Sequence, residues 1–118
     1  MSVSIELREI GNVVVLDLDG ESSIMDGTIL QQTVRPLLKD GKRLFVLNLA
    51  GLRHLDSFGL GQMVATYTSV RDQNGDVKLA NPVPTVKNLL RYTRIDTVLK
   101  VYATEAEAIQ ELLKPTAT

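Results

Sequence analysis

The chain has 118 residues, of which 13 are Lys or Arg and 14 are Asp or Glu, giving a formal net charge of −1. Charges of both signs are spread along the chain, so it lacks the basic face that marks a nucleic-acid binder. The absence of cysteine excludes disulfides, thiolate metal sites and thiol redox chemistry.

The length predicts one domain, which we expect to span residues 1–114, with a short flexible tail at 115–118. Residues 1–6 have neither the basic start nor the apolar run of a signal peptide. No stretch approaches the ~20 apolar residues of a membrane span. These features predict a soluble, cytoplasmic protein with no direct membrane insertion.

Two strands are predicted at the start of the chain. Val3, Ile5 and Leu7 alternate with polar residues, which is the period of a half-buried strand. A second strand is expected over residues 13–19, and Gly11–Asn12 fits a hairpin turn between the two. We therefore expect an antiparallel pair at the beginning of the domain.

A first helix is predicted to begin after Asp26 as its N-cap, with apolar residues at helical spacing from 29 to 38, and Gly41 fits its C-terminal cap. Pro36 lies inside this pattern. Because proline removes a hydrogen bond and clashes with the preceding turn, we expect a kink or a break near residues 34–35.

The centre of the chain begins with Leu44–Leu49, whose apolar run predicts a strand buried on both faces in the middle of a parallel sheet. A loop is expected over residues 50–55, followed by a helix that starts at Asp56–Ser57. The residues expected on its core face are Leu60, Met63, Val64, Tyr67 and Val70. Ser57 is predicted to be the N-cap, with its hydroxyl bonded to free N–H groups of the first turn.

The first turn of this helix contains two glycines, Gly59 and Gly61, which each cost roughly 1 kcal/mol relative to alanine. Close approach by another backbone is the expected compensation. A helical wheel places an aromatic ring and mostly small residues opposite the core face, namely Phe58, Gly61, Gln62, Ala65 and Ser69. We interpret this surface as a docking patch for another protein.

The remainder predicts a strand over residues 77–80, a helix over about 85–92, a strand over 98–102 and a last helix that starts with the capping box Thr104–Glu107. Strands therefore alternate with helices after the opening hairpin. This order predicts an α/β fold with a mixed, largely parallel sheet and about four helices packed against it.

The segment Asp56-Ser57-Phe58-Gly59-Leu60-Gly61, which follows a strand and a loop, resembles the D-S-x-G-L-G signature of STAS domains. The resemblance is to the small anti-sigma factor antagonists of bacteria in particular, and it extends over nearly the whole chain. It implies the STAS fold. It also implies that Ser57 is phosphorylated by a cognate anti-sigma factor with serine kinase activity, and that a serine phosphatase removes the phosphate.

The family often has a second serine where this chain has Phe58, and its first connection often reads G-E-L-D where this chain has Gly20-Glu21-Ser22-Ser23. The resemblance places that connection beside the phosphoserine. We therefore assign one partner-binding surface to Glu21, Ser22, Ser23, Asp56, Ser57, Phe58, Gly59, Gly61, Gln62 and Ala65. Two solvated loop serines are the alternative interpretation of Ser22 and Ser23.

Phosphorylation of Ser57 would add a charge of about −1.5 to −2, which the N-terminal end of a helix dipole tolerates. A dianion beside Asp56 would oppose burial of this surface by a partner. The expected function is a non-enzymatic antagonist that binds its anti-sigma factor when unphosphorylated, releases it when phosphorylated, and so regulates a sigma factor. We expect a monomer or a weak dimer.

The sequence leaves several alternative functions open. Ser57 could be an ordinary cap, and the domain could be a STAS scaffold or regulatory subunit of a stress-sensing complex or a transport system, without a direct sigma-factor role. Gly59-Leu60-Gly61 at a helix start could bind an anionic nucleotide, although the P-loop lysine motif is missing. We expect no bound cofactor.

Catalysis and metal binding are disfavoured by the same residues. The sequence around Ser57 is L-D-S-F-G, whereas a hydrolase nucleophile elbow reads G-x-S-x-G. His54 is the only histidine, so it would have to be the base of any His-based triad, and no second histidine is available for another role. Without cysteine or a second histidine, the usual metal ligands are also missing.

Overall fold

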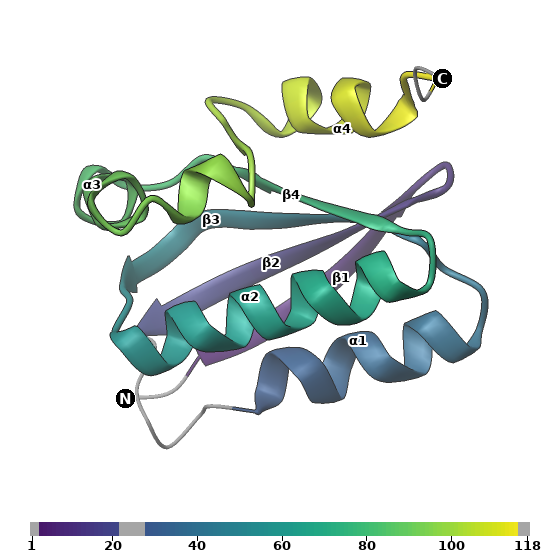
Figure 1. Ribbon diagram of the computed structural model, residues 1–118, viewed down its shortest axis with the longest axis horizontal. Helices are drawn as coiled ribbons and strands as arrows, with labels where there is room; N and C mark the ends of the chain where they lie inside the picture. The colour runs from purple at the N-terminus through teal and green to yellow at the C-terminus, as the bar shows by residue number, and fades with distance from the viewer. Residues whose placement is uncertain (1–2, 22–27, 116–118) are drawn as a thin grey trace.

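The computed structural model describes residues 3–21 and 28–115. Within these residues, five strands form one sheet in the order β1-β2-β3-β4-β5, as seen in Figure 1. The first two strands are antiparallel and the remaining neighbours are parallel. The strands are β1 (Val3–Ile10), β2 (Val13–Glu21), β3 (Leu44–His54), β4 (Asp76–Ala80) and β5 (Val101–Tyr102).

Helices cover both faces of this sheet. In Figure 1, α1 and α2 lie side by side below the sheet, and α4 lies above it. The helices are α1 (Ile29–Lys39), α2 (Ser57–Asp72), α3 (Pro84–Tyr92) and α4 (Glu105–Leu113), with a 3-10 turn at η2 (Ile95–Thr97). The predicted α/β fold, with an opening antiparallel hairpin and an otherwise parallel sheet, is confirmed. The end of the predicted tail, residues 116–118, lies outside the described residues.

The larger core lies between the sheet and the layer formed by α1 and α2. Phe45, Leu47 and Leu49 of β3 point into it and are completely buried. Val46, whose side chain points the opposite way, belongs to a smaller core beneath α4 together with Ala108. Both faces of β3 are therefore covered, as predicted, because helices pack against both sides of it, although Leu44 and Asn48 are half-buried.

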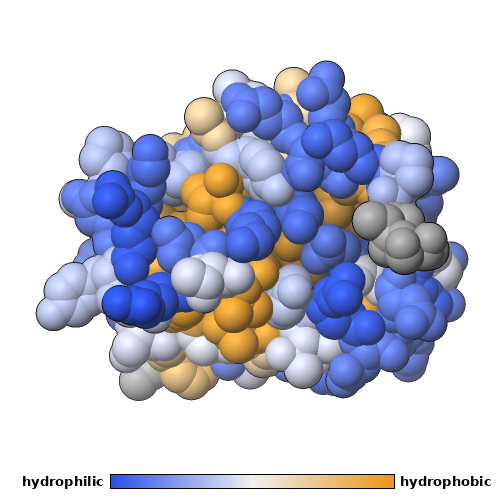
Figure 2. Space-filling model, turned by 45° about the horizontal axis from the view of Figure 1, so that its top comes forward, coloured by the Kyte–Doolittle hydropathy of each residue, from blue (hydrophilic) through white to orange (hydrophobic). Residues whose placement is uncertain are grey.

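Polar side chains dominate the surface on the α4 side, where apolar side chains show through gaps between them, as seen in Figure 2. Arg8 of β1 links three elements on this side. Its guanidinium bonds to Asp17 of β2, at 2.6 and 2.8 Å, and also to Glu105 at the start of α4. The Arg8 guanidinium holds the pKa of Asp17 below its usual value, and Asn48, whose Nδ2 donates to Asp17 at 2.7 Å, lowers this pKa further.

Strand β3 is longer than predicted. The expected loop over residues 50–55 is wrong for most of its length, because β3 continues to His54. Gly51, Leu52 and His54 pair with the end of β2 in a register that shifts near Asp19. A Cβ at Gly51 would lie 2.9 Å from the backbone oxygen of Leu18, so β2 can lie this close only because residue 51 is glycine.

Of the kink or break expected near residues 34–35, the break is wrong, since α1 runs without interruption from Ile29 to Lys39 with Pro36 inside it. The N-cap of α1 is Thr28, and the expected N-cap, Asp26, lies outside the described residues. Proline lacks the N–H that would bond to the carbonyl of Gln32. Both Gln32 and Pro36 lie on the exposed side of α1, where water can bond to this carbonyl. The helix therefore continues through the proline.

The last predicted strand, residues 98–102, is reduced to Val101–Tyr102. The N–H groups of Val98 and Leu99 instead donate to the carbonyl of Ile95 in the turn after η2. The side chain of Val98 is 49% exposed. The last helix begins as predicted, because the hydroxyl of Thr104 accepts a hydrogen bond from the N–H of Glu107 at 3.2 Å.

Candidate functional site

The candidate site lies at the carboxyl edge of the parallel strands, where β3 leads into α2. Only Leu55 and Asp56 separate the two elements. The register between β2 and β3 places Glu21 directly beside His54. Glu21 therefore lies at the same edge of the sheet as Ser57, which follows His54 by three residues (Figure 1).

The N-cap of α2 is Asp56 and not Ser57, so the predicted capping role of Ser57 is wrong. Asp56 has an extended backbone, and its Oδ1 accepts a hydrogen bond of 2.8 Å from the N–H of Gly59. Ser57 is the first residue of the helix and is exposed to solvent. Because the carboxylate provides the cap, the serine hydroxyl is left accessible at the positive end of the helix dipole.

The outer face of α2 carries the predicted docking patch, which consists of Phe58, Gly61, Gln62, Ala65 and Ser69. Phe58 is 38% exposed, so part of a large apolar side chain faces solvent here. Gly61 and Ser69 are exposed, whereas Gln62 and Ala65 are half-buried. Phe58 and Gly61 are thus open to solvent beside Ser57, whereas Gln62 is partly covered by α1, with which it forms a hydrogen bond.

The two glycines of the first turn have different surroundings. Gly59 is buried and donates its N–H to Asp56. Gly61 is exposed, and a Cβ at this position would meet no atom of the described chain within 4 Å. The expected approach of another backbone to Gly61 is therefore not made within the described residues.

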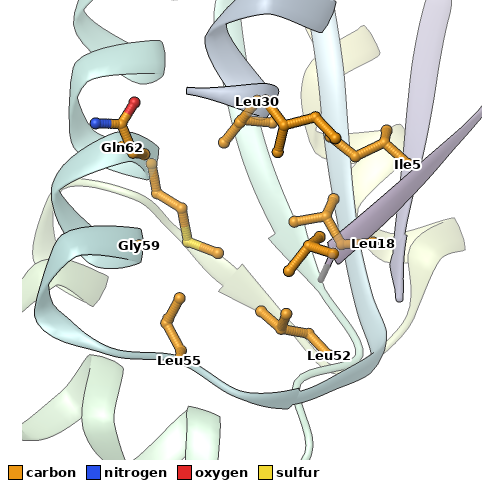
Figure 3. Close-up of a pocket in the computed structure, with 10 residues that line it drawn as sticks. Ile5, Leu18, Leu30, Leu52, Leu55, Gly59 and Gln62 are labelled. Carbon is orange, nitrogen blue, oxygen red and sulfur yellow. The ribbon is translucent and has the colours of Figure 1, made fainter. Parts of the chain in front are cut away.

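An apolar pocket of about 30 Å³ opens beside this turn, between the first turns of α1 and α2 and the hairpin strands. Figure 3 shows side chains from β1, β2, α1 and the β3–α2 corner turned toward it, with Gly59 and Gln62 on the α2 side. Gln62 also bonds to Gln31 of α1 at 2.7 Å. The pocket can hold one methyl-sized group at the rim of the docking patch.

Two residues of the predicted surface, Ser22 and Ser23, lie outside the described residues. Glu21, the last residue of β2, is half-buried. Close by, the exposed Arg53 pairs with Asp19 at 3.6 Å. The edge of the sheet beside Ser57 therefore carries side chains of both charges.

In the part of the chain that the structure describes, no group of three His, Asp or Glu side chains is arranged to hold a metal ion. None of the described helices is both long enough and apolar enough to cross a membrane.

One buried polar residue on α2 was not predicted from the sequence. Thr66 is 1% exposed, and its Oγ1 has no hydrogen-bond partner in the described residues. It lies in a groove between α1 and α2 that is lined by Gln31, Arg35, Ser69 and Gln73 among others. Its position in the helical repeat was the available signal, because Thr66 falls on the same side as Met63 and Val70.

Comparison with known proteins gives consistent results. The STAS domain family matches residues 4–108 of this chain. The anti-sigma-B factor antagonist of Bacillus subtilis is 24% identical over 110 residues, which cover 93% of this chain and all of that protein. The solved structure of TM1081 from Thermotoga maritima is 27% identical, covers 92% of this chain and 88% of its own, and has a TM-score of 0.84.

The Bacillus cell fate determinant SpoIIAA, described as an anti-sigma factor antagonist, has been solved in two states. Its unphosphorylated form has a TM-score of 0.79 at 22% identity and covers 97% of this chain and all of its own. Its phosphorylated form has a TM-score of 0.70 at 23% identity and covers 92% of this chain and 98% of its own. At these identities, the likeness establishes a shared fold.

Proposed function

The chain belongs to the STAS domain family and is related to bacterial anti-sigma factor antagonists, and on this premise we propose that phosphorylation of Ser57 switches its binding to an anti-sigma factor. Unphosphorylated, it binds an anti-sigma factor that has serine kinase activity and frees a sigma factor. Phosphorylated on Ser57 by that partner, it is released until a serine phosphatase restores it. Regulation by binding, without catalysis, agrees with the names of its relatives.

The observation that carries the proposal is the division of roles between Asp56 and Ser57. Because Asp56 caps α2, the hydroxyl of Ser57 is exposed and reachable by a kinase. A phosphate on the first residue of the helix gains a favourable interaction of roughly 0.3–1 kcal/mol with the helix dipole. The fold is therefore expected to survive the modification, and the solved phosphorylated form of SpoIIAA supports this expectation.

The phosphate is expected to weaken binding of the partner. The proposed docking surface includes Phe58, Gly61 and the half-buried Gln62. A partner that covers these residues must also cover the groups beside them, and a dianion next to Asp56 would have to lose its water. Phosphorylation thus weakens binding by desolvation and charge repulsion, without refolding the domain.

Gly61 gives independent support for docking at this face. A glycine inside a helix costs roughly 1 kcal/mol relative to alanine. No other part of the described chain comes close enough to Gly61 to require that a side chain be absent there. A partner whose backbone approaches α2 here would explain the glycine. The cytoplasm of a bacterial cell, where sigma factors act, is then the expected place of action.

The decisive experiment uses an anti-sigma factor kinase encoded in the same genome. The protein is incubated with the kinase and ATP, and its intact mass is measured. We expect the wild type and Thr68→Ala to gain one phosphate and Ser57→Ala to gain none. Thr68 is the matched control because it is an exposed hydroxyl residue on α2 outside the docking patch.

Capture of the same kinase without ATP tests the switch. Ser57→Ala should be captured as well as the wild type, whereas Ser57→Asp should be captured much more weakly. Equal capture of the two variants would contradict the proposed switch. Modification of Ser57→Ala would show that the phosphate goes to another residue.

A further inference from the structure

Strand β1 lies at the end of the sheet, and no strand in the described residues pairs with its outer edge. It is eight residues long, and two of its large apolar side chains are partly open to solvent, Leu7 at 47% and Ile10 at 40%. A long edge strand presents unpaired N–H and C=O groups that can pair with another chain.

The hairpin determines which backbone groups of β1 point outward. Ile10 and Val13 close a turn of two residues, so they form a pair that exchanges hydrogen bonds. Such pairs alternate with pairs that do not exchange them. The residues of β1 whose N–H and C=O groups point away from β2 are therefore Val3, Ile5, Leu7 and Glu9.

Charges on β1 distinguish the possible ways in which two copies could pair. Two copies of β1 can pair antiparallel about a twofold axis that passes through one residue of the strand. The outward-pointing N–H and C=O groups of the two copies meet when this residue is Ile5, Glu6, Leu7 or Arg8. Centring on Glu6 or on Arg8 places two like charges opposite each other, which is destabilising. Centring on Ile5 pairs only residues 3–7 and places Glu6 opposite Ser4, which carries no charge.

Centring on Leu7 pairs seven residues of β1 and gives Glu6 an opposite charge. Leu7 then lies opposite Leu7 of the second copy, and Glu6 lies opposite Arg8 of the second copy, twice by symmetry. Both charged pairs fall at positions without backbone hydrogen bonds, where opposed side chains are closest. From this self-complementarity we infer that two copies of the chain associate through β1, forming one continuous sheet about a twofold axis at Leu7.

Arg8 is held in place and keeps one N–H donor free for this contact. Asp17 and Glu105 fix its guanidinium with four hydrogen bonds, which leave one of its five N–H donors free. Glu6 is exposed and has no ion-pair partner among the described residues. Charged residues on edge strands often prevent pairing, but here their spacing brings opposite charges together. The interface is isologous and therefore closes as a dimer.

The dimer leaves the docking patch free. Because the paired β1 strands run in opposite directions, the carboxyl edges of the two parallel sheets face opposite ways. Each copy keeps its own α2 exposed at its own end. The association can therefore be tested separately from partner binding, and failure of either proposal leaves the other standing.

Single cysteines provide a direct test, because the chain has no cysteine of its own. In Leu7→Cys, the two sulfurs would meet across the axis at a Cα separation of about 5.5 Å, which suits a disulfide. In Glu9→Cys, each cysteine would lie opposite Ile5. Under mild oxidation we expect disulfide-linked dimers from Leu7→Cys and few from Glu9→Cys. Equal yields would contradict the register.

The mass of the cysteine-free protein in solution completes the test. We expect sedimentation to show a dimer that dissociates on dilution, and Glu6→Arg to raise the dissociation constant roughly tenfold, because each lost ion pair becomes a repulsive one. The circular dichroism spectrum of Glu6→Arg should match that of the wild type. A monomeric wild type at every concentration would overturn the inference.

Discussion

The carboxylate of Asp56 accepts a hydrogen bond of 2.8 Å from the N–H of Gly59 and thereby caps α2. This bond satisfies one of the free N–H groups of the first turn. It also fixes the direction in which the chain enters the helix, and therefore the position of Ser57. Asp56 is a positioning residue for the serine, in addition to being a charge beside it.

Replacing Asp56 with alanine should destabilise the protein by about 1 kcal/mol, since an N-cap contributes roughly 0.5–2 kcal/mol. Asp56→Asn should restore most of this loss, because asparagine caps about as well as aspartate. Urea denaturation of both variants measures the difference. An Asp56→Asn variant as unstable as Asp56→Ala would show that the charge matters more than the cap.

Asp17 should make folding stability depend on pH in acid. Its pKa is lowered in the folded protein, mainly by the bond to Arg8. Between that lowered value and about 3.9, the ordinary value for aspartate, the unfolded chain binds more protons than the folded one. Stability therefore rises with pH through this window, and the contribution of Asp17 is lost as the pH falls through the folded pKa.

Asp17→Asn should consequently be less stable than the wild type at neutral pH, by about 1 kcal/mol or less because the ion pair is partly exposed. The difference should shrink as the pH falls below 4. Urea midpoints measured across this range provide the test. Arg8→Gln should weaken the pH dependence of the wild type, since it removes the main cause of the low pKa.

Local patterns were sufficient to predict most of the fold. The alternation in β1, the apolar run of β3 and the capping box before α4 each depend on neighbours in sequence. What could not be predicted depends on distant partners. Arg8 and Glu105 are separated by 97 positions, and nothing in either segment indicates that they bond.

The site itself was predicted only in part. Both Asp56 and Ser57 are good N-cap residues, and their sequence cannot decide between them. The structure decides through the extension of β3, which pairs with β2 as far as His54 and leaves two residues before the helix. The proposed docking patch, in contrast, was drawn from helical periodicity alone, and of its members Phe58, Gly61 and Ser69 are exposed whereas Gln62 and Ala65 are half-buried.

The buried hydroxyl of Thr66 offers a test of packing between α1 and α2. A buried polar atom without a partner costs roughly 1–3 kcal/mol, and Thr66 Oγ1 has no partner in the described residues. Thr66→Val replaces this hydroxyl with a methyl group of similar size, so we expect a gain of about 1 kcal/mol in urea denaturation. A loss would show that the hydroxyl binds a water molecule in the groove beside Ser69.

Gly61→Ala should change stability and binding in opposite directions. The space around Gly61 is empty, so the added methyl group meets nothing in the described chain. The substitution should stabilise α2 by up to about 1 kcal/mol, because alanine is the better helix former. If a partner backbone approaches this position, the same methyl group should weaken capture of the anti-sigma factor kinase, by roughly tenfold for a 1.4 kcal/mol clash.

Asn88→Ala provides the matched control for this opposition. Asn88 is exposed in α3 and is not a member of the docking patch, and alanine should stabilise that helix as well. Capture of the kinase should remain as in the wild type for Asn88→Ala, whereas it should fall for Gly61→Ala. If both variants bind equally well, stability and binding are not opposed at Gly61, and the glycine does not serve close approach of a partner.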